Sequence, residues 1–154
     1  MKVLLINARS LSPKLYSMVD TMHEINAHIA LVTETWFKDM KYVEEQLENM
    51  KNALEFACIR KDREGVRTGG GVAIIYKTGD LGMQQIRSST RSEIVAAVGR
   101  RIGQRCKIVV INAYIPPSLD AAESDQVLSE VSDLVGSLKG KYNAPYFLIE
   151  GDFN

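Results

Sequence analysis

Cysteine and histidine are scarce in this sequence, with two of each among 154 residues. Cys58 and Cys106 stand far apart, outside the paired spacing that zinc sites use. Because they also make no disulfide framework, both are expected to be reduced and packed as small apolar side chains. His23 and His28 are five positions apart, whereas a helical zinc-protease motif places its histidines four apart. The sequence therefore gives no support to a zinc site.

A net charge and a long apolar run are also missing. Basic and acidic side chains number 19 each, so there is no global signature of nucleic-acid binding. The charge is nevertheless uneven, since residues 59–107 hold eleven basic side chains against four acidic ones. A polyanion could be attracted to that segment, although solvated charges on loops and edge strands explain any single residue equally well. No stretch has the length of a membrane span or the character of a signal peptide, so we expect an intracellular protein without membrane association.

The composition is typical of one globular domain over residues 1–154, with 45% hydrophobic and 25% charged residues. Apolar runs predict strands at 3–6, 29–32, 54–59, 72–76, 83–87, 94–101, 107–114 and 146–150. Helical periodicity predicts helices at 13–25, capped by Ser12 and Pro13, at 43–53 on the surface, and at about 119–138 with Gly140 as C-cap. This order favours an α/β (α+β) fold in which a mixed sheet has helices on one face.

The stretch 147–154 ends an apolar run in the tetrapeptide Gly151-Asp152-Phe153-Asn154. We expect a buried strand that stops at Gly151, where glycine lets the chain turn sharply. Asp152 and Asn154 would then stand just past the carboxyl end of the strand. Taken alone, the tetrapeptide is more typical of a plain turn, because all of its residues except Phe153 are common in turns.

Polar residues follow other predicted strands in the same way. Asn7 ends the first, Glu34 the second, and Tyr114 the strand before the last helix. If these strands and the last one run parallel, their carboxyl ends share one edge, where α/β proteins form ligand sites. Carboxylate and amide oxygens suit Mg²⁺ or Mn²⁺ better than zinc, and Mg²⁺ held this way usually serves a phosphate substrate. Each residue alone could be structural; the four strand ends together indicate a site.

Five motifs in order then resemble a known family. They are Asn7-Ala8-Arg9-Ser10, Thr33-Glu34-Thr35-Trp36, Arg67-Thr68-Gly69-Gly70-Gly71-Val72-Ala73, Asn112-Ala113-Tyr114-Ile115-Pro116-Pro117 and Gly151-Asp152-Phe153-Asn154. Together they resemble the endonuclease/exonuclease/phosphatase superfamily over the whole chain. The first, second and fifth most resemble the endonuclease domains of non-LTR retrotransposons of the LINE class. The implied fold is the N-terminal half of a four-layer α-β-β-α sandwich.

The resemblance also implies a role for each site residue. Glu34 looks like the principal metal ligand and Asn7 like its neighbour in the metal site. Asp152 is similar to the residue that orients or deprotonates the attacking water, Asn154 to a donor to the scissile phosphate, and Tyr114 to the phenol beside that phosphate. The implied reaction is in-line hydrolysis of a DNA phosphodiester with Mg²⁺ or Mn²⁺.

Two further residues have weaker assignments. Arg9 could reach a phosphate or be an exposed loop arginine, and Trp36 could contact a nucleobase or only pack.

The family pattern continues beyond Asn154 with another Asp and a late His-containing element, so we expect this chain to hold an incomplete catalytic set, truncated at its C-terminal end. His23 and His28 are too distant to substitute. A non-catalytic retroelement remnant or nucleic-acid-binding fragment, and a phosphoesterase for a small molecule or lipid, remain alternatives. A domain holding mainly one sheet would leave an apolar face uncovered, which predicts self-association. An intact retroelement protein would act in the nucleus, and otherwise a cytoplasmic location is expected.

Overall fold

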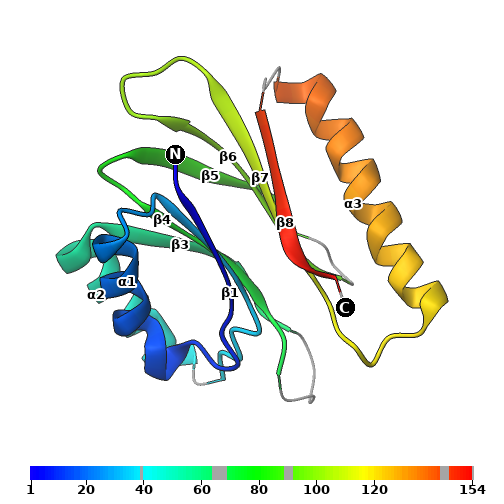
Figure 1. Cartoon of the computed structure of the whole chain (residues 1–154), viewed down its shortest axis with the longest axis horizontal. Helices are drawn as coiled ribbons and strands as arrows, with labels where there is room; N and C mark the ends of the chain where they lie inside the picture. The colour runs from blue at the N-terminus through cyan, green and yellow to red at the C-terminus, as the bar shows by residue number, and fades with distance from the viewer. Residues whose placement is uncertain (39, 64–68, 89–91, 143–145, 154) are drawn as a thin grey trace.

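The strands of this protein form two four-stranded mixed sheets, as Figure 1 shows. The computed structural model describes residues 1–38, 40–63, 69–88, 92–142 and 146–153. Sheet 1 has the order β1 (Val3–Asn7), β2 (Ile29–Thr33), β4 (Val72–Lys77), β3 (Phe56–Lys61). Sheet 2 has the order β5 (Leu81–Ser88), β6 (Glu93–Arg101), β7 (Lys107–Ile115), β8 (Tyr146–Phe153). The helices are α1 (Leu15–Glu24), which follows a 3-10 turn at Ser12–Lys14, α2 (Met40–Leu54) and α3 (Ala121–Tyr142).

The two sheets pack face to face with helices on their outer sides. The shared interior contains Leu31 and Ile74 from sheet 1 and Val95 and Val110 from sheet 2, all fully buried. Helices α1 and α2 cover the outside of sheet 1, and α3 covers the outside of sheet 2 (Figure 1). All four α-β-β-α layers are therefore present. The predicted fold class is confirmed, but the expectation of mainly one sheet with an uncovered apolar face is wrong, because β5–β8 form a second sheet that covers the first.

Strands β1 and β8 are edge strands of sheet 1 and sheet 2. Within the described chain, β1 and β8 each pair with one strand only, β1 with β2 and β8 with β7, and both pairs are parallel. Leu5 on β1 and Ile149 and Phe153 on β8 keep 48%, 38% and 44% of their surface exposed. These two edges lie side by side in Figure 1. Among the described helices, none has the length and apolar character needed to span a bilayer.

Two predicted helix caps are wrong. Ser12 does not cap α1, because a 3-10 turn at Ser12–Lys14 precedes the helix, which begins at Leu15. The Ser12 hydroxyl instead donates to Gln46 Oε1 at 2.6 Å and so links this turn to α2. Gly140 does not end α3, which continues to Tyr142. Helix α2 is more than a surface helix, since Val43, Gln46 and Met50 are buried at helical spacing.

Asn112 links the two sheets through a buried side chain on β7. Its Nδ2 donates to the backbone oxygens of Val32 and Ala73 in sheet 1, both at 2.9 Å. We expect Asn112→Ala to lower the free energy of unfolding by about 2–3 kcal/mol, because it removes two buried hydrogen bonds and leaves a small cavity. Urea unfolding followed by circular dichroism measures this loss. The exposed helical Asn52→Ala is the control and should not destabilise the protein. Equal stability of the two variants would contradict the linking role.

Candidate active site

Three hydrogen bonds join the ends of four strands into one polar cluster. Asn7 Nδ2 donates to Glu34 Oε1 and to Asp152 Oδ2, both at 2.9 Å. The Tyr114 hydroxyl donates to Glu34 Oε1 at 2.8 Å. The cluster therefore brings together residues of both sheets, including Asn7 and Asp152, which are 145 positions apart in the chain. Polar residues at parallel strand ends do converge here, as expected, although they belong to two sheets that meet at one end of the molecule.

The backbone beside the cluster is held in an unusual conformation. Glu34 has a φ of 54°, a left-handed value rarely adopted by a residue with a side chain. Hydrogen bonds from both sides fix this turn: Ser10 N donates to Glu34 O at 2.9 Å, and Thr35 N donates to Gly71 O at 3.2 Å. Such local strain persists where the surrounding structure enforces it, and it is concentrated at functional sites. The loops after β1 and β2 and the glycine segment before β4 thus position the Glu34 carboxylate together.

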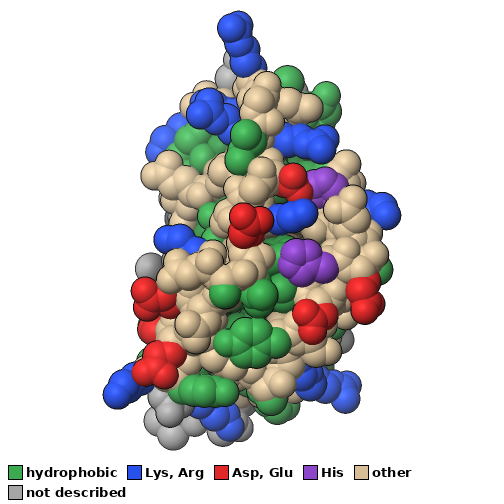
Figure 2. All heavy atoms as spheres, turned by 90° about the vertical axis from the view of Figure 1, so that its left-hand side faces the viewer, with side chains coloured by type: hydrophobic (Ala, Val, Ile, Leu, Met, Phe, Trp, Pro, Cys, Tyr) green, Lys and Arg blue, Asp and Glu red, His purple; other side chains and the backbone are tan. Residues whose placement is uncertain are grey.

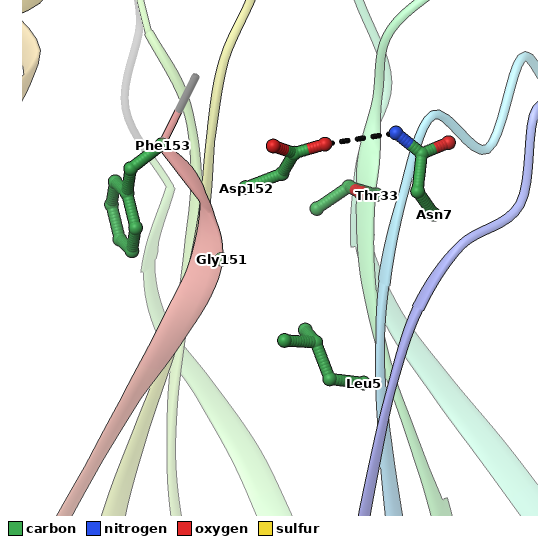
Figure 3. A pocket seen from close by; sticks show the side chains of 6 residues that line it. All are labelled: Leu5, Asn7, Thr33, Gly151, Asp152 and Phe153. Atoms are coloured by element: carbon green, nitrogen blue, oxygen red, sulfur yellow. Dashed lines mark hydrogen bonds between the residues drawn. The ribbon is translucent and has the colours of Figure 1, made fainter.

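A cavity of about 420 Å³ opens beside Asn7 and Asp152 (Figure 3). Leu5, Thr33, Gly151 and Phe153 complete its lining. In Figure 3 the Asp152 and Asn7 side chains point toward one another across the space between β8 and β1, while the Phe153 ring points away. The volume lies in the range of small-molecule sites. The ends of the Asn7 and Asp152 side chains therefore face a space large enough for a small ligand.

The cluster carries more negative than positive charge. Glu93, a buried carboxylate at the start of β6, accepts hydrogen bonds from Arg63 and from the backbone amide of Gly71. Among the described residues, Arg63 is the only cation that forms an ion pair with any of Glu34, Glu93 and Asp152. The second oxygens of Glu34 and Asp152 receive no hydrogen bond from the described side chains or backbone. Uncompensated carboxylates beside an amide are the donor set that Mg²⁺ accepts, so the residues present fit a divalent metal.

Tyr114 remains a neutral phenol in this setting. Burial is the main cause that raises its pKa above the ordinary value of 10.0, followed by the hydrogen bond to Glu34 and the negative charges of Glu34 and Glu93. Tyr114 therefore acts as a hydrogen-bond donor to Glu34 and not as a base.

This raised pKa gives a prediction for alkaline stability. A group whose folded pKa lies above its unfolded pKa stabilises the protein fully below the unfolded value, near pH 10, and the contribution disappears as the pH rises further. At pH 8 we expect the free energy of unfolding of wild type to be about 1 kcal/mol higher than that of Tyr114→Phe. This difference should decrease as the pH rises above about 10. Urea unfolding of both proteins at the two pH values tests this. The shared titration of Tyr76 cancels in the difference. Parallel pH curves would contradict the assignment.

Arg9 and Trp36 do not join the cluster. Arg9 is exposed in a left-handed conformation, with no side-chain partner among the described residues. Trp36 is half-buried against Gly69, and its Nε1 is buried without a hydrogen-bond partner in the described part of the chain. Asn154 lies outside the described residues. The roles of all three remain predictions.

The predicted turn at Gly151 is wrong, because β8 runs on to Phe153 and carries Asp152 within the strand. Glycine is needed there because β8 lies very close to β7: a Cβ at Gly151 would lie 2.0 Å from the backbone oxygen of Ala113. The roles of Arg63 and Glu93 were not predicted from the sequence. A lone acid before an apolar run and an arginine in a charged loop are common surface features, so no sequence signal separated this pair from solvated charges.

No protein-family model and no curated protein sequence matches this chain. The human Nocturnin catalytic domain, solved with a bound sulfate anion, matches at 9% identity with a TM-score of 0.69, over 99% of this chain and 64% of that one. An endonuclease/exonuclease/phosphatase family protein from Bacteroides thetaiotaomicron matches at 16% identity with a TM-score of 0.68, over 99% and 64%. The endonuclease domain of TRAS1, a telomere-specific non-LTR retrotransposon, matches at 18% identity with a TM-score of 0.61, over 97% and 57%.

At these identities the likeness concerns the fold, and this chain spans less than two thirds of each of the three solved chains. The resemblance inferred from five ordered motifs agrees with it. The chain has the fold of the endonuclease/exonuclease/phosphatase family.

Proposed function

We propose that this chain carries the metal-binding side of a DNA endonuclease site of the non-LTR retrotransposon type, which hydrolyses phosphodiester bonds. The observation that carries the proposal is the hydrogen-bonded cluster of Asn7, Glu34, Tyr114 and Asp152 with its surplus of negative charge. The fold shared with the TRAS1 endonuclease domain supports the choice of DNA as substrate. Because the solved relatives are longer than this chain, we further propose that it is the N-terminal portion of the catalytic domain.

Each residue would have a distinct task. Glu34, with the Asn7 amide oxygen, would hold Mg²⁺ or Mn²⁺, which when bound supplies positive charge to a phosphoryl oxygen. In that state the Asn7 amide would turn its oxygen toward the metal, and its present position as a donor to both carboxylates keeps it within reach. Asp152 would accept a hydrogen bond from the attacking water and orient it in line with the scissile bond. Tyr114 would keep the Glu34 carboxylate in place, and Asn154 would donate to the phosphate.

A plasmid-nicking assay tests the proposal. Supercoiled plasmid is incubated with the protein and Mg²⁺, with Mn²⁺, and with EDTA. Conversion to the open circle with either metal and none with EDTA would support catalysis by these 154 residues. The absence of nicking at every metal concentration would overturn catalysis by these 154 residues, and the absence of a Mg²⁺-dependent thermal shift would overturn the metal site itself.

The same cluster also suits a phosphoesterase that acts on a small molecule or lipid. Soluble phosphomonoesters and short-chain phospholipids, assayed beside DNA under identical conditions, separate the two functions. Faster hydrolysis of a soluble phosphoester than of plasmid would favour that alternative over the endonuclease.

A further inference from the structure

The end of sheet 2 opposite the candidate active site carries a concentration of positive charge. The exposed hairpin between β6 and β7 contributes Arg100, Arg101, Arg105 and Lys107, and the end of α3 contributes Lys139 and Lys141. Among the described residues, none of these six cations forms an ion pair. Figure 2 views the molecule from the side opposite α3, and on that face Lys and Arg side chains lie at the top while Asp and Glu side chains appear further down.

A recess of about 370 Å³ lies within this basic end, and we call it the hairpin recess. Its lining includes Gly82 and Gln84 of β5, Val98 and Arg100 of β6, and Lys107 of β7. Gly82 leaves it open, because no atom lies within 4 Å of the position that a Cβ would occupy there.

The two cations of the recess are placed unfavourably in the protein alone. Arg100 and Lys107 are direct partners across the β6–β7 pair. Like charges opposite one another destabilise a sheet, so an anion between them would relieve a repulsion that is already built in.

Aromatic side chains border the same surface. Lys107 Nζ lies 6.0 Å from the centre of the Tyr142 ring and Lys141 Nζ lies 5.3 Å from it, while Lys139 Nζ lies 6.0 Å from the Phe147 ring. The end of α3 thus adds two lysines and a half-buried tyrosine beside Lys107. A basic surface with an aromatic ring is the combination by which proteins hold a nucleotide chain, through phosphate contacts and base stacking.

The recess is separate from the candidate active site. Lys107 and Tyr114 stand near opposite ends of β7, seven residues apart, which at about 3.3 Å per residue is roughly 23 Å. A bound strand could therefore occupy the recess without touching the carboxylate cluster.

We propose that the hairpin recess binds single-stranded nucleic acid. A recess of this volume admits one nucleotide at a time, whereas a duplex would lie across its rim without entering it. Phosphates would contact Arg100 and Lys107, and a base would stack against Tyr142.

Fluorescence anisotropy with a labelled oligothymidine of about 12 nucleotides, in EDTA so that no cleavage occurs, tests this proposal. The double variant Arg100→Glu with Lys107→Glu is expected to bind at least about tenfold more weakly. Gly82→Val fills the recess without changing charge and is expected to weaken binding by a similar factor. The matched control is the double variant Lys41→Glu with Lys51→Glu, which changes two exposed cations of α2 and alters the net charge by the same amount. Its affinity for the oligonucleotide should stay within about twofold of wild type.

Three outcomes would overturn the proposal. An unchanged affinity of a folded Gly82→Val protein for the oligonucleotide would mean that the basic surface attracts nucleic acid without using the recess. Equal competition by duplex of the same length would remove the preference for single strands. Tighter binding to vesicles with anionic lipids than to the oligonucleotide would assign the surface to a membrane. Circular dichroism checks that each variant folds. Because the assay reads binding without catalysis, its result is independent of whether the chain cuts DNA.

Discussion

Replacing Glu34 with glutamine is expected to reduce Mg²⁺-dependent DNA nicking by at least about 10²-fold while leaving the protein folded. The carboxylate accepts from Asn7 Nδ2 and from the Tyr114 hydroxyl through the same oxygen, Oε1. Glutamine keeps an oxygen that can accept both hydrogen bonds, so the cluster retains its shape. The substitution removes the charge, and with it the chief attraction for a divalent cation.

The stability of this variant should not fall. Glu34 and Asp152 both accept from the same Asn7 nitrogen, so two negative charges lie close together with no ion-pair partner among the described residues. Neutralising one of them removes a repulsion and is expected to leave the free energy of unfolding equal or slightly higher. Activity and stability thus separate, which excludes unfolding as the cause of lost nicking.

Thermal unfolding with and without Mg²⁺ supplies a second measurement that needs no cleavage. Millimolar Mg²⁺ should raise the midpoint of wild type by mass action, and EDTA should reverse the rise. The rise should disappear in Glu34→Gln. Glu150→Gln is the matched control, because Glu150 lies on the same strand as Asp152 but makes no hydrogen bond to the cluster. A Mg²⁺ shift that persists in Glu34→Gln, or vanishes equally in Glu150→Gln, would contradict the assignment of Glu34.

The four residues of the cluster were predictable because of where they stand in the sequence. Asn7, Glu34, Tyr114 and Asp152 each lie at or just after the end of a strongly apolar run, and such runs are the most reliable strand signal. Strands joined by helices run parallel, so their carboxyl ends come together. The pairings β1 with β2 and β7 with β8 follow this rule. The rule accounts for Asn7 lying beside Glu34 in sheet 1 and Tyr114 lying beside Asp152 in sheet 2. The contact between the two pairs depends on how the sheets stack.

What escaped prediction depends on contacts between segments distant in sequence. The chain divides into two sheets because β5, Leu81–Ser88, pairs with β6 and not with a strand of sheet 1. Nothing in the local pattern distinguishes this from continued pairing with sheet 1. The ion pair of Arg63 and Glu93 and the sheet-to-sheet hydrogen bonds of Asn112 likewise exist only once both sheets are stacked. The residue type alone indicates such roles weakly. A charged or amide side chain can be identified as a buried structural residue only when its hydrogen-bond or ion-pair partner is known.

Substituting alanine for Gly151 is expected to give the largest loss of stability among the changes considered for β8. Gly151 pairs with Ala113 in the parallel β7–β8 ladder. A Cβ at this position would lie 2.0 Å from the Ala113 backbone oxygen and 2.9 Å from its carbonyl carbon. Both are backbone atoms fixed within a sheet, so relief requires β8 to move away from β7. We expect the free energy of unfolding to fall by about 3 kcal/mol or more.

The same movement should reach the candidate active site. Asp152 is the next residue, paired with Tyr114, and its carboxylate meets Asn7 on the other sheet. A displaced β8 would withdraw Asp152 from that contact, so Gly151→Ala should also lose the Mg²⁺-dependent rise in the unfolding midpoint. Gly82→Ala is the matched control: it is also a strand glycine, but a Cβ there meets nothing within 4 Å. Its stability should equal or exceed that of wild type, because alanine restricts the unfolded chain. Full stability of Gly151→Ala would contradict the close approach of β8 to the Ala113 backbone.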